Sequence, residues 1–202
     1  PEYLIVRTKD FIVGIDGELY VDWQTSDEYD ARGAKNESAH NAIMGEAAIL
    51  EVMPCHGFSN PTKLHFKRLI GEAIWNSLEH DYKNAKVLLE AARIYVQARS
   101  EEISRFWYLS AAFLTSAPLA AIGIVAWIAR GPFVNWFGEP ALWIFLGTIA
   151  GALGALLSVI WRSGKLAFDC SAGAKLHYLE GACRISAGAL SGLLVALAVW
   201  SQ

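Results

Sequence analysis

Three long apolar blocks, none of which contains a charged side chain, constrain the fold of this chain more than any other feature. The blocks are residues 106–129, 141–161 and 185–200, which are 24, 21 and 16 residues long. A helix needs about 20 apolar residues to cross roughly 30 Å of hydrocarbon. The first two blocks are long enough, whereas the third is short. The pattern predicts an α-helical membrane protein with two or three transmembrane helices.

Charged residues divide the chain into two parts. Hydrophobic residues make up 54% of the sequence and charged residues 18%, which is too apolar for an ordinary soluble domain. Residues 1–100 carry 11 Lys/Arg and 15 Asp/Glu, whereas residues 101–202 carry 6 and 5. We therefore expect an N-terminal α+β domain at 1–100 and a transmembrane region at 101–202. Neither part is basic enough to bind phosphate backbones, so nucleic acid is expected to act indirectly if at all.

The first residues show the alternation of β-strands. Residues 3–6 and 11–15 are apolar and rich in β-forming side chains, and residues 18–23 alternate after Asp16 and Gly17. Asp-Gly between two such runs is typical of a two-residue type I′ turn, which needs positive φ at both central residues. The pattern predicts a β-hairpin within a small antiparallel sheet.

Helical spacing of apolar residues follows. It occurs at 39–53, 60–77 and 79–99. Asn60 followed by Pro61 is typical of a helix start, with Asn60 as the cap and Pro61 at the first helical position. The segment 24–38 is polar, and its acidic residues match no cation-binding loop, so we expect a solvated loop there. No Gly or Pro separates the last of these helices from the first apolar block, which favours one continuous helix.

The three cysteines are Cys55, Cys170 and Cys183, an odd count without paired spacing, so we predict no disulfide. Cys55, His56 and His65 are candidate metal ligands, and the first two are a candidate nucleophile and base. Adjacent residues seldom point at one another and no second cysteine pair supports a zinc site, which favours a turn with a small buried thiol. We expect no metal, no cofactor and no catalytic activity.

Basic residues flank the blocks asymmetrically. Arg93, Arg99 and Arg105 precede the first block, and Arg130 alone lies between the first and second. The segment 163–184, which follows the second block, is basic. Basic residues collect on the cytoplasmic side of membranes. We expect the N-terminal domain and segment 163–184 in the cytoplasm, segment 130–140 and the tail outside, and a multi-pass protein of the inner membrane.

Small residues recur every fourth position in all three blocks. They are Ala112, Ser116 and Ala120; Gly147, Gly151 and Ala155; and Gly188, Gly192 and Ala196. Such stripes let helix backbones approach closely in lipid. Two interpretations remain open: packing of the three helices within one chain, or oligomerisation. Pro118 removes a backbone donor in the first block and predicts a kink, which is either a hinge or a bend that improves packing.

No Asp, Glu, Lys, Arg or His lies within the apolar blocks. This absence argues against a coupled transporter and an intramembrane enzyme, which usually need an ionisable group within the bilayer. In segment 163–184 the polar candidates are Asp169, His177 and Glu180. His177 could sense pH or bind a metal, but a lone histidine at a membrane boundary is more often a surface contact.

The order of these parts, a soluble domain followed by a few spans rich in small residues, resembles the small transmembrane effectors of bacterial anti-phage defence systems, of the retron-associated or cyclic-oligonucleotide-signalling type. The resemblance implies a toxic inner-membrane effector that partners hold silent. Our hypothesis is an oligomerising effector that permeabilises the membrane and is controlled through its cytoplasmic domain. The alternatives are a non-catalytic anchor or subunit of a cytoplasmic complex, and a channel or transport accessory protein. The expected partners are the lipid bilayer and either further copies or a cytoplasmic protein.

Overall fold

The computed structural model describes residues 2–165, 168 and 172–201. The chain forms two compact units, Pro1–Ser100 and Glu101–Gln202, which are described separately. Asp169 and Cys170, which the sequence singles out, lie outside the described residues.

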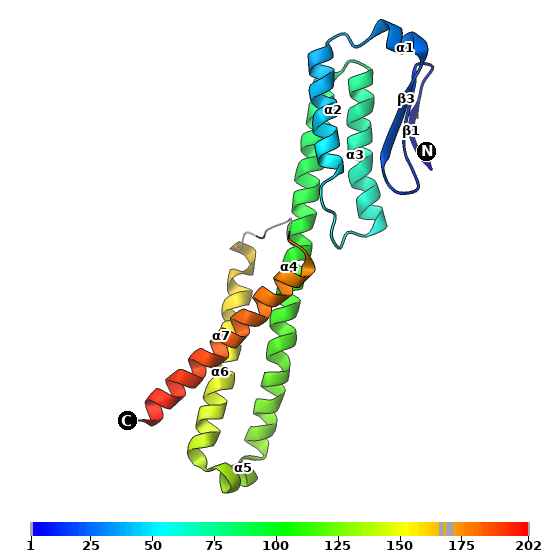
Figure 1. Ribbon diagram of the computed structural model, residues 1–202. Coiled ribbons are helices and arrows are strands. Elements are labelled where there is room, and N and C mark those ends of the chain that lie inside the picture. Colours follow the sequence, from blue (N-terminus) through cyan, green and yellow to red (C-terminus); the bar gives the residue numbers. More distant parts are fainter. Residues whose placement is uncertain (1, 166–167, 169–171, 202) are drawn as a thin grey trace. The chain divides into compact units, whose positions relative to one another are not determined.

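The first unit opens with a three-stranded antiparallel sheet (Figure 1). The strands are β1 (Tyr3–Arg7), β2 (Phe11–Ile15) and β3 (Val21–Thr25), in the order β1-β2-β3. The central strand is buried along most of its length. Helix α3 (Asn60–Leu78) packs against the sheet at Gly71, where a Cβ atom would lie 2.2 Å from Cδ1 of Ile5. A larger residue at this position would displace the end of the Ile5 side chain.

The turn between β2 and β3 is not the predicted two-residue type I′ turn. It spans residues 16–20, and the positive φ of 65° falls at Leu19. One oxygen of the Asp16 carboxylate accepts hydrogen bonds from the backbone N–H groups of Glu18 at 3.0 Å and Tyr20 at 2.8 Å. Aspartate side chains stabilise turns by binding the backbone that follows. These bonds favour a longer loop than the Asp-Gly pair alone indicates.

Four helices contribute to the first unit. They are α1 (Asp27–Arg32), α2 (Glu37–Glu51), α3 (Asn60–Leu78) and the first part of α4 (Tyr82–Ile128). Helix α1 lies where the sequence predicted a loop. It begins because the Ser26 side chain accepts a hydrogen bond from the backbone N–H of Tyr29. The cap of α3 is likewise Ser59, and not the predicted Asn60.

Apolar side chains of these helices and the sheet form the core of the first unit. Fully buried members include Val13, Ile43, Phe66, Ile70 and Leu89. A buried lysine joins three elements at its edge: Nζ of Lys67 donates to the carbonyl oxygen of Glu51 at 2.8 Å. Oε1 of Glu51 in turn accepts from the backbone N–H of Val21 at 2.6 Å. The charge is therefore buried with its partners satisfied.

Helix α4 is continuous for 47 residues and contributes to both units. The structure thus confirms the predicted continuous helix, which runs from Tyr82 to Ile128 through most of segment 79–99 and nearly all of the first apolar block. Pro118 lies inside it and is exposed.

The second unit contains the rest of α4 with α5 (Arg130–Phe137), α6 (Glu139–Arg162), the short 3-10 helix η1 (Ser163–Lys165) and α7 (Ala174–Trp200). Three helices, α4, α6 with η1, and α7, are long and apolar enough to cross a membrane by length and composition. Helix α7 begins eleven residues before the apolar block at 185–200. Its 27 residues span about 40 Å at 1.5 Å per residue, so the helix that contains the third block is long enough to cross a membrane. The expected loop at 130–140 is largely helical.

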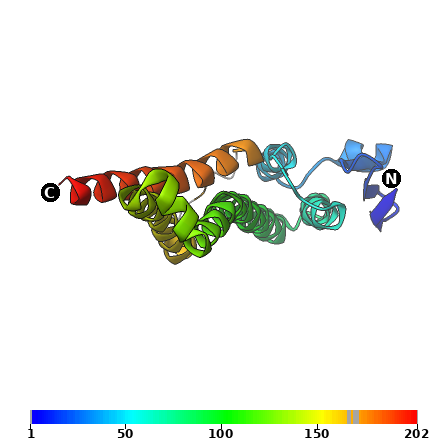
Figure 2. The ribbon, with the colours of Figure 1, turned by 90° about the horizontal axis from the view of Figure 1, so that it is seen from below.

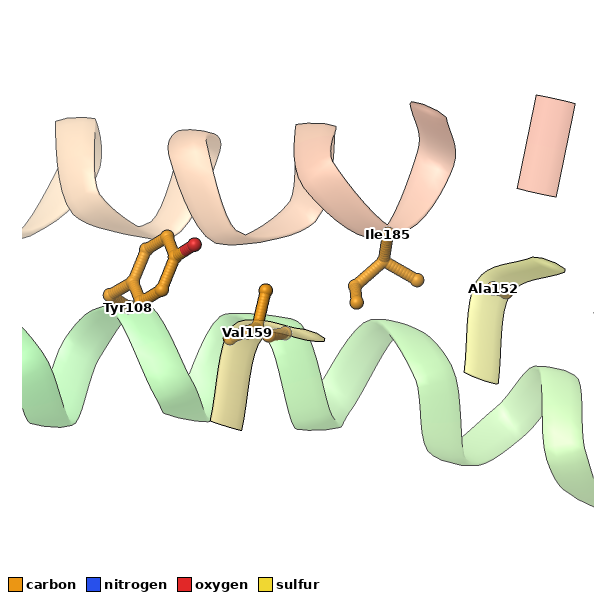
Figure 3. Close-up of a cluster of buried hydrophobic side chains, with 5 residues drawn as sticks. Tyr108, Ala152, Val159 and Ile185 are labelled. Atoms are coloured by element: carbon orange, nitrogen blue, oxygen red, sulfur yellow. The ribbon is translucent and has the colours of Figure 1, made fainter. Parts of the chain in front are cut away.

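A small cluster of buried side chains joins the helices of the second unit. Its members are Tyr108, Ala112, Ala152, Val159 and Ile185. Figure 3 shows Tyr108 extending from α4 towards α7, and Ile185 extending from α7 towards the other helices. Most other side chains of α7 are exposed; those buried are His177, Gly181 and Ile185, at intervals of four residues along one face.

Candidate functional site

The small residues that the sequence singled out in α6 and α7 meet where these two helices cross. A Cβ atom at Gly151 would lie 2.3 Å from the carbonyl oxygen of Gly188 and 2.7 Å from Cα of Gly192. A Cβ atom at Gly192 would lie 2.3 Å from the carbonyl oxygen of Gly147. The two backbones are therefore in direct contact, and any larger residue at these positions forces the helices apart.

The alanines complete the contact at its two ends. A Cβ atom at Gly188 would lie 2.3 Å from Cβ of Ala155, and one at Gly147 would lie 2.8 Å from Cβ of Ala196. These pairings run antiparallel, and Figure 1 shows α7 crossing α6. All six predicted residues thus meet within one chain. Packing between copies through the same residues would have to replace this contact, so oligomerisation through the stripes themselves stays a prediction.

An apolar groove of about 800 Å³ lies along this crossing. Its walls include the two stripes together with Trp143 of α6 and Trp200 of α7. Ala150 and Ser191 also line the groove, and both are exposed. Figures 1 and 2 show the C-terminal end of α7 extending away from α6. The groove therefore offers small side chains to whatever lies beside the two helices.

The stripe on α4 also faces other helices of the second unit. Ala112 and Ser116 are buried, and Ala120 is half-buried. On the same helix a Cβ atom at Gly123 would lie 3.0 Å from Cδ1 of Ile149 on α6. Pro118 lies among these residues without ending the helix. Whether it bends or acts as a hinge stays a prediction.

The interpretation of His177 as a surface contact is wrong. The residue is 1% exposed, and neither ring nitrogen has a hydrogen-bond partner in the described part of the chain. Its ring stacks on Trp107 of α4 with the centroids 6.2 Å apart, and Phe168 meets it edge-on at 5.8 Å. The carboxylate of Glu180 lies 3.6 Å from Nδ1. The four-residue spacing from His177 to Gly181 and Ile185 was the signal that could have placed this histidine on the buried face.

The cysteine and histidines of the N-terminal unit do not form a site. The Cys55 thiol donates to the carbonyl oxygen of Met53 at 3.5 Å, and burial raises the pKa of this thiol. The His65 ring packs edge-on against Tyr95 with centroids 4.8 Å apart, while His56 is exposed. Among the described residues no three candidate ligands are close enough to hold a metal, and Cys55 and Cys183 are free thiols.

The comparisons with known proteins identify no relative: no protein family, no curated protein and no solved structure matches this chain. The class that the fold defines is a mostly helical protein with three candidate membrane-spanning helices and a small N-terminal sheet.

Proposed function

We propose that this protein is an integral inner-membrane effector whose helices oligomerise and permeabilise the bilayer, under the control of its cytoplasmic N-terminal unit, in anti-phage defence. The observation that carries the proposal is the groove at the α6–α7 crossing. It is apolar, it is lined by small residues, and it remains open in a single chain. The occupant that we propose is a helix from a second copy.

The chemistry of the groove favours a helix over water or a polar ligand. Lipid tails are as apolar as leucine, so helices associate in membranes through close van der Waals contact between small residues. Ala150 and Ser191 supply such residues on opposite walls. The Ser191 hydroxyl donates to the carbonyl oxygen of Ala187 on its own helix, so it presents little free polarity.

Permeation in this proposal requires several copies. Three polar side chains within the second and third apolar blocks donate to carbonyl oxygens of their own helices: Thr148 to Ile144 at 2.9 Å, Ser186 to Ala182 at 3.0 Å and Ser191 to Ala187 at 2.8 Å. Such back-bonded hydroxyls do not by themselves line an aqueous path. A pore or a bilayer defect would therefore form between subunits, and no coupled transport is expected.

The test is expression in a bacterial host with a membrane-potential dye, with and without neighbouring gene products. We expect depolarisation by the wild-type chain. Ala150→Leu fills the groove without touching the glycine contact and should abolish depolarisation. Ala121→Leu adds the same side chain at an exposed position of α4 outside the groove, so it should depolarise as the wild type does. No depolarisation by the wild type, or full activity of Ala150→Leu, would contradict the proposal.

A second function has its own supporting observation. The N-terminal unit exposes large apolar side chains, namely Ile49 on α2, Val52 directly after it, and Val87 and Ile94 on α4, with exposed fractions from 57% to 79%. Exposed apolar patches on soluble units are common at protein interfaces. This surface supports a membrane anchor for a cytoplasmic complex. Recovery of a stable complex without any depolarisation would favour the anchor.

A further inference from the structure

A polar cavity in the N-terminal unit has no role in the function proposed above. Its volume is about 500 Å³. The turn between β1 and β2, helix α1 with the residues after it, and the end of α3 form its walls. The lining residues are Thr8, Lys9, Asp10, Phe11, Tyr29, Arg32, Gly33, Lys35, Leu78, Glu79 and His80. All of them belong to the first unit.

Cations outnumber anions in this lining. Lys9, Arg32 and Lys35 are basic, whereas the carboxylates are those of Asp10 and Glu79. Arg32 pairs with Asp10, which leaves Lys9 and Lys35 without an ion-pair partner among the residues that the structure describes. The surrounding chain has the opposite balance, because residues 1–100 contain 15 acidic and 11 basic residues. A cleft with an excess of one charge concentrates ions of the other sign.

Local structure holds these groups in place. The Thr8 hydroxyl accepts from the backbone N–H of Phe11 at 3.0 Å and of Asp10 at 3.3 Å, which fixes the turn that carries Lys9. On the opposite wall the Tyr29 hydroxyl donates to the carbonyl oxygen of Leu78 at 2.8 Å and joins α1 to the end of α3. The cavity is therefore part of the folded unit and not a gap between loose loops.

His80 forms part of the wall in a strained conformation. Its φ of 66° lies in the left-handed region, which non-glycine residues seldom adopt. Its ring stacks on Tyr29, and Nδ1 lies 3.2 Å from the hydroxyl of Tyr82. Burial lowers the pKa of His80, and the nearby charge of Lys35 lowers it further. The effect of Lys35 agrees with a positive potential inside the cavity. Strained residues of this kind concentrate at binding sites.

We propose that this cavity binds a small organic molecule that carries a phosphate group. Lys9, Lys35 and the outer face of Arg32 would hold the phosphate, because ammonium and guanidinium groups form strong charge-assisted hydrogen bonds with phosphate oxygens. The half-buried ring of His80, stacked on Tyr29, supplies a flat surface for a ring-sized body. The volume suits such a molecule better than a bare ion, since ligand cavities of about 300–1,000 Å³ hold organic ligands.

The test is isothermal titration calorimetry on the full chain in detergent, in phosphate-free buffer of low ionic strength. The probes are phenyl phosphate, inorganic phosphate and benzoate. Phenyl phosphate should bind most tightly, because it supplies both the dianion and the ring. Equal affinity for benzoate, or no heat with any probe, would overturn the proposal.

Charge-removing variants locate the binding. Lys9→Gln and Lys35→Gln should each weaken phenyl phosphate about tenfold, a loss typical of one charge-assisted hydrogen bond. Lys86→Gln removes the same charge from an exposed position of α4 outside the cavity and should change the affinity little. A loss of the same size in Lys86→Gln would mean attraction to overall charge only and would refute the site. The result is independent of whether the chain depolarises membranes.

Discussion

The glycine contact between α6 and α7 leads to a sharp prediction about stability. In Gly151→Ala the added Cβ would lie 2.3 Å from the carbonyl oxygen of Gly188, whereas real Cβ atoms essentially never come within 3.0 Å of another atom. The obstructing atoms belong to the backbone of α7, so they cannot rotate away and the helices must separate. In Gly154→Ala, three residues along the same helix, the new Cβ would meet nothing within 4 Å. The two variants therefore make the same chemical change with and without a collision.

The size of the effect follows from the contacts that separation weakens. Moving a few tens of atom pairs apart by up to 1 Å forfeits a quarter to a half of an attraction of about 0.1–0.2 kcal/mol per pair. Overpacking in well-packed interiors costs about 1–3 kcal/mol, which is the loss we expect for Gly151→Ala. Gly154→Ala should leave stability unchanged or raise it by up to about 1 kcal/mol, because alanine favours helix more than glycine does.

The assay is equilibrium unfolding in mixed micelles by titration with sodium dodecyl sulfate, followed by tryptophan fluorescence. Because the contact lies within one chain, the loss should not depend on protein concentration. Equal stabilities of Gly151→Ala and Gly154→Ala would refute the reasoning. A loss that appears only at high protein concentration would instead indicate that these glycines pack between copies.

Three further predictions concern single side chains. Tyr29→Phe removes the bond to the Leu78 carbonyl and should lower stability by about 1–2 kcal/mol in thermal melts. Burial raises the pKa of Tyr29, so the stability that its neutral hydroxyl contributes is present below pH 10 and falls as the pH rises through the raised pKa. Thermal melts at pH 9 to 11 should show this decline in the wild type and less of it in the variant. Leu19→Gly relieves the positive φ at that turn and should stabilise the N-terminal unit by about 1 kcal/mol; a lower melting temperature would count against strain there. His177→Phe replaces a buried ring whose nitrogens have no hydrogen-bond partner among the described residues, and it should keep or raise stability in unfolding titrations, whereas a marked loss would reveal a polar partner for the imidazole.

Local patterns predicted most of the secondary structure. Uncharged runs of about 20 residues predict membrane-spanning helices, because a backbone group without a hydrogen bond is too costly inside the hydrocarbon of a bilayer. The strands at residues 3–6 and 11–15 and the helix at 60–77 also follow from periodicity, with ends shifted by a residue or two. Two local predictions were wrong because of a single side chain in each case. The Asp16 carboxylate stabilises a longer turn, and the Ser26 hydroxyl caps helix α1.

The third candidate membrane-spanning helix shows that an uncharged block can be shorter than the helix that contains it. Helix α7 begins at Ala174 and includes four charged or histidine residues before the block, namely Lys175, His177, Glu180 and Arg184. One of these, His177, is buried against Trp107 although it reads as polar. Burial depends on which neighbour covers a residue, and the covering ring belongs to a helix about 70 positions away in the sequence.

By itself the sequence determined that this chain contains three apolar blocks, two of them long enough for a membrane-spanning helix, and that each carries a stripe of small residues at four-residue spacing. Only the tertiary structure decided which stripes meet: Gly151 faces Gly188 and Gly192 of the same chain, while Ala150 and Ser191 line an open groove. The physical reason is that helical periodicity selects a face of a helix but carries no information about what lies opposite, because a neighbour in the same chain and a neighbour in a second copy require the same small residues.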